Sequence, residues 1–222
     1  MNTIIFSDTH LTEIYNPQFF SILKQVISQA DRIIINGDFW DGYLTDFNSF
    51  INSEWKNLFP LLKQKNTIYI YGNHDPKLIN DQRTQLFSNI QTNQYELNQG
   101  KYHYYIQHGH LIYSSWFSRF ATLFPHTLVK KANLWLEYRK QTNPSIRKIS
   151  ELIEKHLDKD GDEKLVAYTL KRKKSKNDLY IYGHTHLTRM IPEIGYINPG
   201  RFSLTKPNFI KITDTRCEIA SI

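Results

Sequence analysis

The sequence contains a single cysteine and no long hydrophobic run. Cys217 alone can build neither a disulfide framework nor a thiolate zinc site, which predicts a reducing compartment. No apolar stretch approaches the roughly 20 residues of a membrane-spanning helix. The segment from Met1 to Asp8 lacks the basic and apolar regions of a signal peptide and is interpreted as a first strand. We therefore expect a cytoplasmic location.

Internal repeats and low-complexity segments are also absent. Hydrophobic residues make up 40% of the 222 positions, which is enough for a packed core and excludes a disordered or fibrous chain. The length fits one domain of generous size, so we expect a single domain over residues 1–222.

Strand-like and helical stretches alternate up to Ile90. Predicted strands are Thr3–Ser7, Arg32–Asn36 and Thr67–Tyr71, and predicted helices are Pro17–Gln29, Phe47–Lys65 and Lys77–Phe87. This order indicates an α/β fold with a parallel sheet covered by helices. Ligands bind beyond the carboxyl ends of the strands in such sheets, and polar motifs follow each of these strands.

The pattern changes after Ile90, where strands without regular helices between them predict a second, mixed or antiparallel sheet. These strands are Lys101–Gln107, Leu179–Tyr182, Gly195–Ile197, Asn208–Ile212 and Arg216–Ala220. A helical insertion at about residues 115–174 interrupts them. Within it, Asn143 and Pro144 are typical of a helix start, and Asp158–Glu163 is interpreted as a charged turn.

Positive charge is concentrated in this insertion, although the net charge of the whole chain is only +7. Residues 111–176 include 15 basic and 7 acidic side chains, against 13 and 14 in the rest. Such a segment favours an anionic partner, but a solvated basic helix face explains it equally. Aromatic residues interleaved with the charges, such as Trp116, Trp135 and Tyr138, leave peripheral membrane contact open.

Five polar motifs each follow a predicted strand. In chain order they are Asp8-Thr9-His10, Gly37-Asp38, Gly72-Asn73-His74-Asp75, His108-Gly109-His110 and Gly183-His184-Thr185-His186. Each is weak or moderate alone, whereas all five in this order are a strong signal. Oxygen and imidazole donors without sulfur predict divalent metal ions, manganese first, with iron or zinc as alternatives.

With these motifs the chain resembles the calcineurin-like metallophosphoesterase superfamily. The segment Tyr196-Ile197-Asn198-Pro199-Gly200 is similar to the family's segment after its last histidine pair, although Arg201 stands where the family usually has serine. The resemblance covers most of the chain to about Arg201, apart from the insertion. It implies a two-sheet αββα sandwich with a helical insertion, in agreement with the strand pattern.

The resemblance also implies a set of ligands for two metal ions. One metal would take Asp8, His10 and His186, the other would take Asn73, His108 and His184, and Asp38 would bridge both. A metal-bridging hydroxide would then attack phosphorus in line, opposite the leaving oxygen. The reaction expected is hydrolysis of a phosphoester or pyrophosphate bond.

Four further residues are assigned roles near the metals. His74 is expected to be catalytic, because it would stabilise the transition state or protonate the leaving group. Asp75 would orient His74 or support the ligands. His110 is interpreted as a residue that supports a metal ligand or faces the substrate, with plain packing as an equal alternative. Asp41 would bond a ligand histidine or form a turn, and we favour the turn.

The substrate is less defined than the reaction. The insertion and the segments Ser7–Leu11 and Gly37–Asp41 resemble the UDP-2,3-diacylglucosamine pyrophosphohydrolase branch, which would imply a lipid-linked substrate. That branch's best-known members have arginine at the position of His74 and aspartate at that of His110. A phosphorylated small molecule, a nucleotide or a nucleic acid bound through Lys171–Lys174 are alternatives. A non-catalytic interaction scaffold on the same fold is the remaining alternative.

Overall fold

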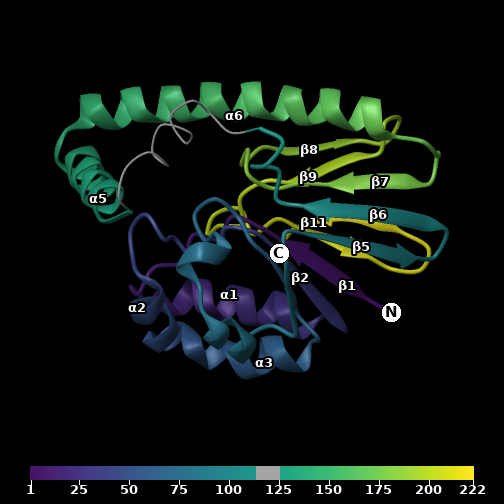
Figure 1. Cartoon of the computed structure of the whole chain (residues 1–222), viewed down its shortest axis with the longest axis horizontal. Coiled ribbons are helices and arrows are strands. Elements are labelled where there is room, and N and C mark those ends of the chain that lie inside the picture. The colour runs from purple at the N-terminus through teal and green to yellow at the C-terminus, as the bar shows by residue number, and fades with distance from the viewer. Residues whose placement is uncertain (114–125) are drawn as a thin grey trace.

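The computed structural model describes residues 1–113 and 126–222, and side chains from residue 128 onward in the second range. Two β-sheets lie face to face with helices on the outside (Figure 1). The first sheet has the order β11-β10-β1-β2-β3-β4 and the second has the order β5-β6-β7-β9-β8. This arrangement confirms the predicted αββα sandwich.

The first sheet joins segments from both ends of the chain. Its strands are β1 (Thr3–Phe6), β2 (Arg32–Asn36), β3 (Ile68–Ile70), β4 (Ile90–Thr92), β10 (Phe209–Ile212) and β11 (Cys217–Ala220). Strands β1 to β4 are parallel, and β10 pairs antiparallel with β1. The carboxyl ends of β1, β2 and β3 therefore meet at one edge.

The second sheet is mixed. Its strands are β5 (Gln94–Gln99), β6 (Tyr102–Gln107), β7 (Asp178–Ile181), β8 (Thr188–Ile191) and β9 (Tyr196–Pro199). Strands β6 and β7 are parallel, so their carboxyl ends also share an edge. The amide of Gly183 donates to the carbonyl of His108 (3.0 Å) and ties together the loops that follow these two strands.

Side chains alternate between two cores, as the two-residue period of a strand requires. Ile34 of β2 points into the core between the sheets, where it meets residues such as Ile106 and Ile181. Its neighbours Ile33 and Ile35 point to the other face, which α1 (Pro17–Ser28), α2 (Phe47–Asn52) and α3 (Phe59–Gln64) cover. Both faces of the central strands are thus buried, which explains their almost wholly apolar sequences.

The prediction of one long helix over Phe47–Lys65 is wrong, because the chain forms α2, the 3₁₀ helix η1 (Glu54–Leu58) and α3 in succession. Ser53 has an extended backbone (ψ 173°) and ends α2, and a proline occupies the first turn of α3. The helix predicted over Lys77–Phe87 is likewise two 3₁₀ helices, η2 (Lys77–Ile79) and η3 (Gln82–Leu86). Asn80 between them is extended (ψ 161°).

The assignment of strands to sheets also needs correction. We expected Asn208–Ile212 and Arg216–Ala220 in the second sheet, yet as β10 and β11 they extend the first. Strands β4, β5 and β8 were not predicted, because they are short or rich in polar residues. Edge strands such as these bury little apolar surface and leave a weak sequence pattern.

The described part of the insertion contains α5 (His126–Thr142) and α6 (Pro144–Arg172). Asn143 caps α6 by accepting from the amide of Ser145 (3.0 Å), as predicted. The turn predicted over Asp158–Glu163 is wrong, because α6 continues through it. Gly161 lies where a Cβ would come within 2.6 Å of the Tyr113 ring, so glycine permits close packing and does not end the helix.

The C-terminal half of α6 lies on the outer face of the second sheet (Figure 1), where Leu165 packs with Tyr182 and Tyr196. In the described parts of the chain, no helix is both long and apolar enough to cross a membrane. Trp135 and Tyr138 of α5 are largely exposed. The predicted aromatic stretch around Trp116 lies outside the described residues.

Candidate metal centre

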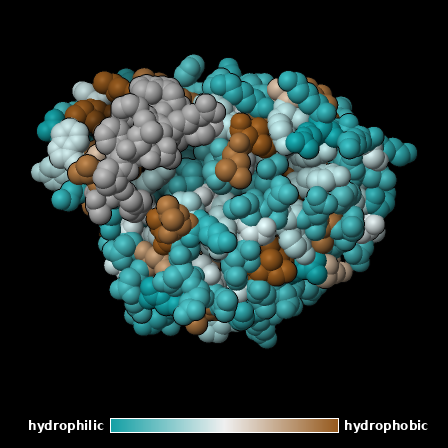
Figure 2. Space-filling model, viewed as in Figure 1, coloured by the Kyte–Doolittle hydropathy of each residue, from teal (hydrophilic) through white to brown (hydrophobic). Residues whose placement is uncertain are grey.

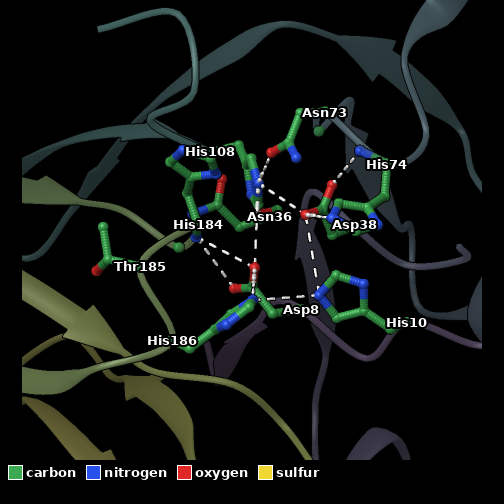
Figure 3. Close-up of polar contacts among 12 residues, drawn as sticks. Asp8, His10, Asn36, Asp38, Asn73, His74, His108, His184, Thr185 and His186 are labelled. Carbon is green, nitrogen blue, oxygen red and sulfur yellow. Dashed lines mark hydrogen bonds and ion pairs between the residues drawn. The ribbon is translucent and has the colours of Figure 1, made fainter. Parts of the chain in front are cut away.

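Five loops from the two sheets converge at one point (Figure 3). The loops after β1, β2 and β3 come from the first sheet, and those after β6 and β7 come from the second. They bring together all of the predicted metal ligands, which are Asp8, His10, Asp38, Asn73, His108, His184 and His186.

The backbone at this point has an unusual conformation. Among the described residues, six non-glycine residues have positive φ, and five of them are Asp8, His10, Asp38, His184 and His186. A side chain in this region costs of order 1–3 kcal/mol and persists where the surroundings or a function require it. The concentration of strain in the predicted ligands supports a functional role for the cluster.

Glycines beside the ligands allow the loops to approach each other closely. A Cβ on Gly37 (φ 84°) would lie 2.3 Å from Nδ1 of His108, and one on Gly72 would lie 2.0 Å from Oδ1 of Asp38. Any larger side chain at either position would push these two side chains away from the cluster.

The first donor group consists of Asp8, His10 and His186, whose ligand atoms all lie within 4.8 Å of one another. Nε2 of His186 is 3.3 Å from Nε2 of His10 and 3.5 Å from Oδ1 of Asp8. The amide of His184 donates to both oxygens of Asp8 (3.1 and 3.2 Å) and holds that carboxylate in place.

The second donor group consists of Asp38, His108 and His184. Nε2 of His108 lies 3.2 Å from Oδ2 of Asp38 and 3.1 Å from Oδ1 of Asn73. The same Oδ2 atom lies 3.9 Å from Nε2 of His10. Asp38 therefore stands between the two groups, where a bridging carboxylate would have to be.

The chemistry of the cluster fits two divalent cations. Asp8 and Asp38 are buried, and among the described residues no lysine or arginine pairs with them. Burial opposes protonation of His108, yet Asp38 raises its pKa to about 10. Burial and His74 lower the pKa of His10 to about 4. Since buried carboxylates need a cation, metal ions would replace the histidine protons.

Asp41 contacts two histidines at once. Its Oδ1 is 3.0 Å from Nδ1 of His74, and its Oδ2 is 3.4 Å from Nδ1 of His10. Asp41 also accepts from the amide of Tyr43 (2.9 Å), so the turn that we favoured accounts for only part of its contacts. Burial opposes protonation of His74, but Asp38 and Asp41 raise its pKa to about 9.

Asp75 supports the loop of Asp38 and makes no hydrogen bond or ion pair with the His74 ring in the described structure. Its carboxylate accepts from the amides of Asp38 (3.0 Å), Phe39 (2.6 Å) and Gly72 (2.7 Å). These three hydrogen bonds hold two ligand loops together. Of the two roles considered for Asp75, this geometry favours support of the ligands.

His110 lies beside the second donor group without belonging to it. Its ring centroid is 5.4 Å from that of His108, and its Nδ1 is buried with no hydrogen-bond partner in the described structure. Burial and the neighbouring His108 lower its pKa to about 4. A neutral imidazole there can accept or donate one hydrogen bond.

Two further residues, which the sequence analysis did not identify, contact the predicted ligands. The carbonyl oxygen of Asn36 lies 2.8 Å from Nδ1 of His108, which directs Nε2 into the cluster. Oδ2 of Asp158, on α6, lies 3.6 Å from Nδ1 of His186. A backbone carbonyl leaves no sequence signal, and Asp158 lies in the insertion, far in sequence from any motif. Such partners fix the orientation of metal-binding histidines.

We expect the variant Asp158→Ala to bind metal more weakly than wild type, by about 10- to 100-fold, because His186 loses the carboxylate that orients it. Isothermal titration of Mn²⁺ into metal-free protein measures this change. Asp160→Ala is the matched control, since Asp160 is on the same helix and forms an ion pair with Lys164 at the surface. Equal affinities in both variants would show that α6 does not support the centre.

A family model for calcineurin-like phosphoesterases matches residues 1–187, and the chain therefore belongs to this family. It is similar in structure to the phosphoesterase Yfce from E. coli, with 16% identity, a TM-score of 0.49 and coverage of 100% of this chain and 98% of that one. A novel archaeal phosphodiesterase is 17% identical to this chain with a TM-score of 0.45, and the match covers 100% of both chains. Vacuolar Protein Sorting 29 from Cryptosporidium parvum is 11% identical with a TM-score of 0.46, and the match covers 100% of this chain and 96% of that one. No curated protein matches the chain.

Proposed function

We propose that this protein hydrolyses phosphoester or pyrophosphate bonds with two divalent metal ions, manganese first among the candidates. The observation that carries the proposal is the placement of Asp38 between two buried groups of oxygen and imidazole donors. Family membership supports the same reaction class. A non-catalytic scaffold would not need this complete and strained set of donors.

Each residue has a role in this proposal. Asp8, His10 and His186 would hold one ion, Asn73, His108 and His184 would hold the other, and Asp38 would contact both. When bound, the ions would lower the pKa of a water molecule and neutralise charge on the phosphoryl oxygens.

His74 acts on the substrate. Its ring contacts Asp41 through Nδ1 and lies with Nε2 4.0 Å from Oδ2 of Asp38, at the edge of the cluster. Burial opposes protonation of the ring, but Asp38 and Asp41 raise its pKa to about 9. It can therefore donate a proton to the leaving oxygen, and Asp41 holds the ring in the orientation that this transfer needs.

A cavity of about 560 Å³ adjoins the metal cluster and extends beneath α5 and α6. Among its lining residues in the described structure, Leu44 has the only hydrocarbon side chain. Figure 2 shows a mainly hydrophilic face, with hydrophobic residues in separate patches. These features favour a polar phosphorylated substrate over the acyl chains of a diacylglucosamine.

We expect hydrolysis of bis-p-nitrophenyl phosphate to depend on added metal. Treatment with a chelator should lower the rate by at least about 10²-fold, because the charge that stabilises the transition state is removed. Addition of Mn²⁺ should restore it, and release of p-nitrophenolate measures both steps. A rate that is the same with and without chelator would contradict the proposal.

A further inference from the structure

The cavity beside the metal cluster has one wall on α5 and α6 and another on the loop after β9. Residues from both walls carry positive charge, namely Lys140, Arg147 and Arg201. They differ in how far neighbouring carboxylates neutralise them. This difference indicates which chemical group of a substrate would bind in the cavity.

Two of the three charges already have partners. Nζ of Lys140 lies 2.7 Å from Glu137 and 2.8 Å from Glu154, and these three side chains form a closed network between α5 and α6. Arg147 lies 4.0 Å from Glu151, and both side chains are exposed. Both of these positive charges are therefore already directed at glutamates of the cavity wall.

Arg201 is different, because its guanidinium has no hydrogen bond or ion pair with any described residue, although it lines the same cavity as His186. Arg201 is exposed to solvent and lies beside a predicted metal ligand, and no described carboxylate pairs with it, so its guanidinium is available to an anion that enters the cavity.

The backbone of Arg201 is fixed in position. Oδ1 of Asn198 accepts from the amide of Gly200 (2.9 Å), and the carbonyl of Ser7 accepts from the amide of Phe202 (3.0 Å). Arg201 is thus held between two anchored neighbours, and its own amide lies 3.4 Å from the carbonyl of His186. The side chain begins from a rigid base at the rim of the metal centre, as a specificity residue requires.

We propose that Arg201 binds a second phosphate group of the substrate, adjacent to the phosphorus that is attacked. The substrate class is then a diphosphate compound, and the bond cleaved is a pyrophosphate bond. A guanidinium can donate two parallel N–H hydrogen bonds to two phosphate oxygens. This geometry suits a diphosphate at the end of the substrate or one that links two parts of it. This inference rests on the function proposed above and narrows it.

The reaction balances without a further reactant. The oxygen of water forms a new bond to the attacked phosphorus, and the bond from that phosphorus to the bridging oxygen breaks. The bridging oxygen leaves with the second phosphate, and the protons of water pass to the two phosphate products or to solvent. Arg201 holds the negative charge that develops on the leaving phosphate.

Non-hydrolysable probes test the inference on the metal-loaded protein. Binding of methylenediphosphonate, which has two phosphonate groups, is compared with binding of methylphosphonate, which has one, by isothermal titration. Arg201→Ser should weaken binding of the diphosphonate at least about 10-fold, since a charged hydrogen bond to phosphate is lost. Methylphosphonate binding should change by less than about twofold, and Arg201→Lys should recover part of the loss.

Two controls separate this role from general effects. Arg216→Ser removes the same charge from the exposed β10–β11 connection and should leave both affinities unchanged. The metal content of Arg201→Ser should equal that of wild type. Equal weakening of both probes, or no weakening of either, would overturn the inference. Absence of metal-dependent hydrolysis in wild type would instead overturn the proposed function itself.

Discussion

The variant Asp38→Asn is expected to lose at least about 10³-fold in kcat/KM for bis-p-nitrophenyl phosphate, a change equivalent to about 4 kcal/mol. The substitution preserves the size of the side chain but removes the negative charge between the two donor groups. Oδ1 of Asp38 also accepts a hydrogen bond from the backbone amide of His74 (2.8 Å). The Asp38 carboxylate therefore also helps to position His74, the proposed proton donor. Steady-state assays at saturating Mn²⁺ measure the loss.

Asp31→Asn provides the matched control, because Asp31 is an exposed aspartate whose Oδ2 accepts from the amide of Asn2 (2.7 Å). It should retain wild-type kcat/KM to within about twofold. Circular dichroism of both variants checks that the fold is preserved. If Asp38→Asn kept wild-type activity while folded, the position between the donor groups would have no catalytic meaning.

Asp162→Ala should lower the free energy of unfolding by about 3 kcal/mol, because it removes a buried carboxylate and leaves the buried hydroxyl of Tyr196 without its hydrogen-bond partner. Asp162 is buried on α6 and accepts from the hydroxyl of Tyr196 and from Nη1 of Arg189 (2.7 Å). These contacts attach α6 to β8 and β9. Urea unfolding followed by circular dichroism measures the change.

Glu163→Ala is the control for this prediction. Glu163 is the next residue on the helix and contacts the same Arg189 at 2.9 Å, but its side chain is exposed. An exposed pair of this kind contributes at most about 1 kcal/mol. Similar losses in the two variants would show that the buried contacts of Asp162 are not what attaches α6.

The fold was predictable where the sequence pattern is local. The strands β1, β2 and β3 are runs buried on both faces, and their apolar residues identify them directly. The pairing of β10 with β1 connects opposite ends of the chain, and no local pattern specifies which sheet it joins. The break at Ser53 was hidden because hydrophobic spacing continues on both sides of it.

Most of the cluster was predictable because its residues follow strands in short motifs. Asp8 and His10 are separated by one residue, and the positive φ of both turns them to the same point. The contacts of Asp41 and Asp158 depend on how α6 and the loops pack, so the sequence left the role of Asp41 open and did not indicate Asp158. Gly161 was interpreted as a turn for the same reason, since its contact with Tyr113 is tertiary.

We propose that two metal ions occupy the donor groups on either side of Asp38. Anomalous difference maps from crystals grown with Mn²⁺ and measured at the manganese absorption edge would locate these ions. We expect two peaks roughly 3.5–4 Å apart, one beside Asp8, His10 and His186, and the other beside Asn73, His108 and His184. A map with no peak at these residues in protein that still hydrolyses bis-p-nitrophenyl phosphate would contradict the proposal.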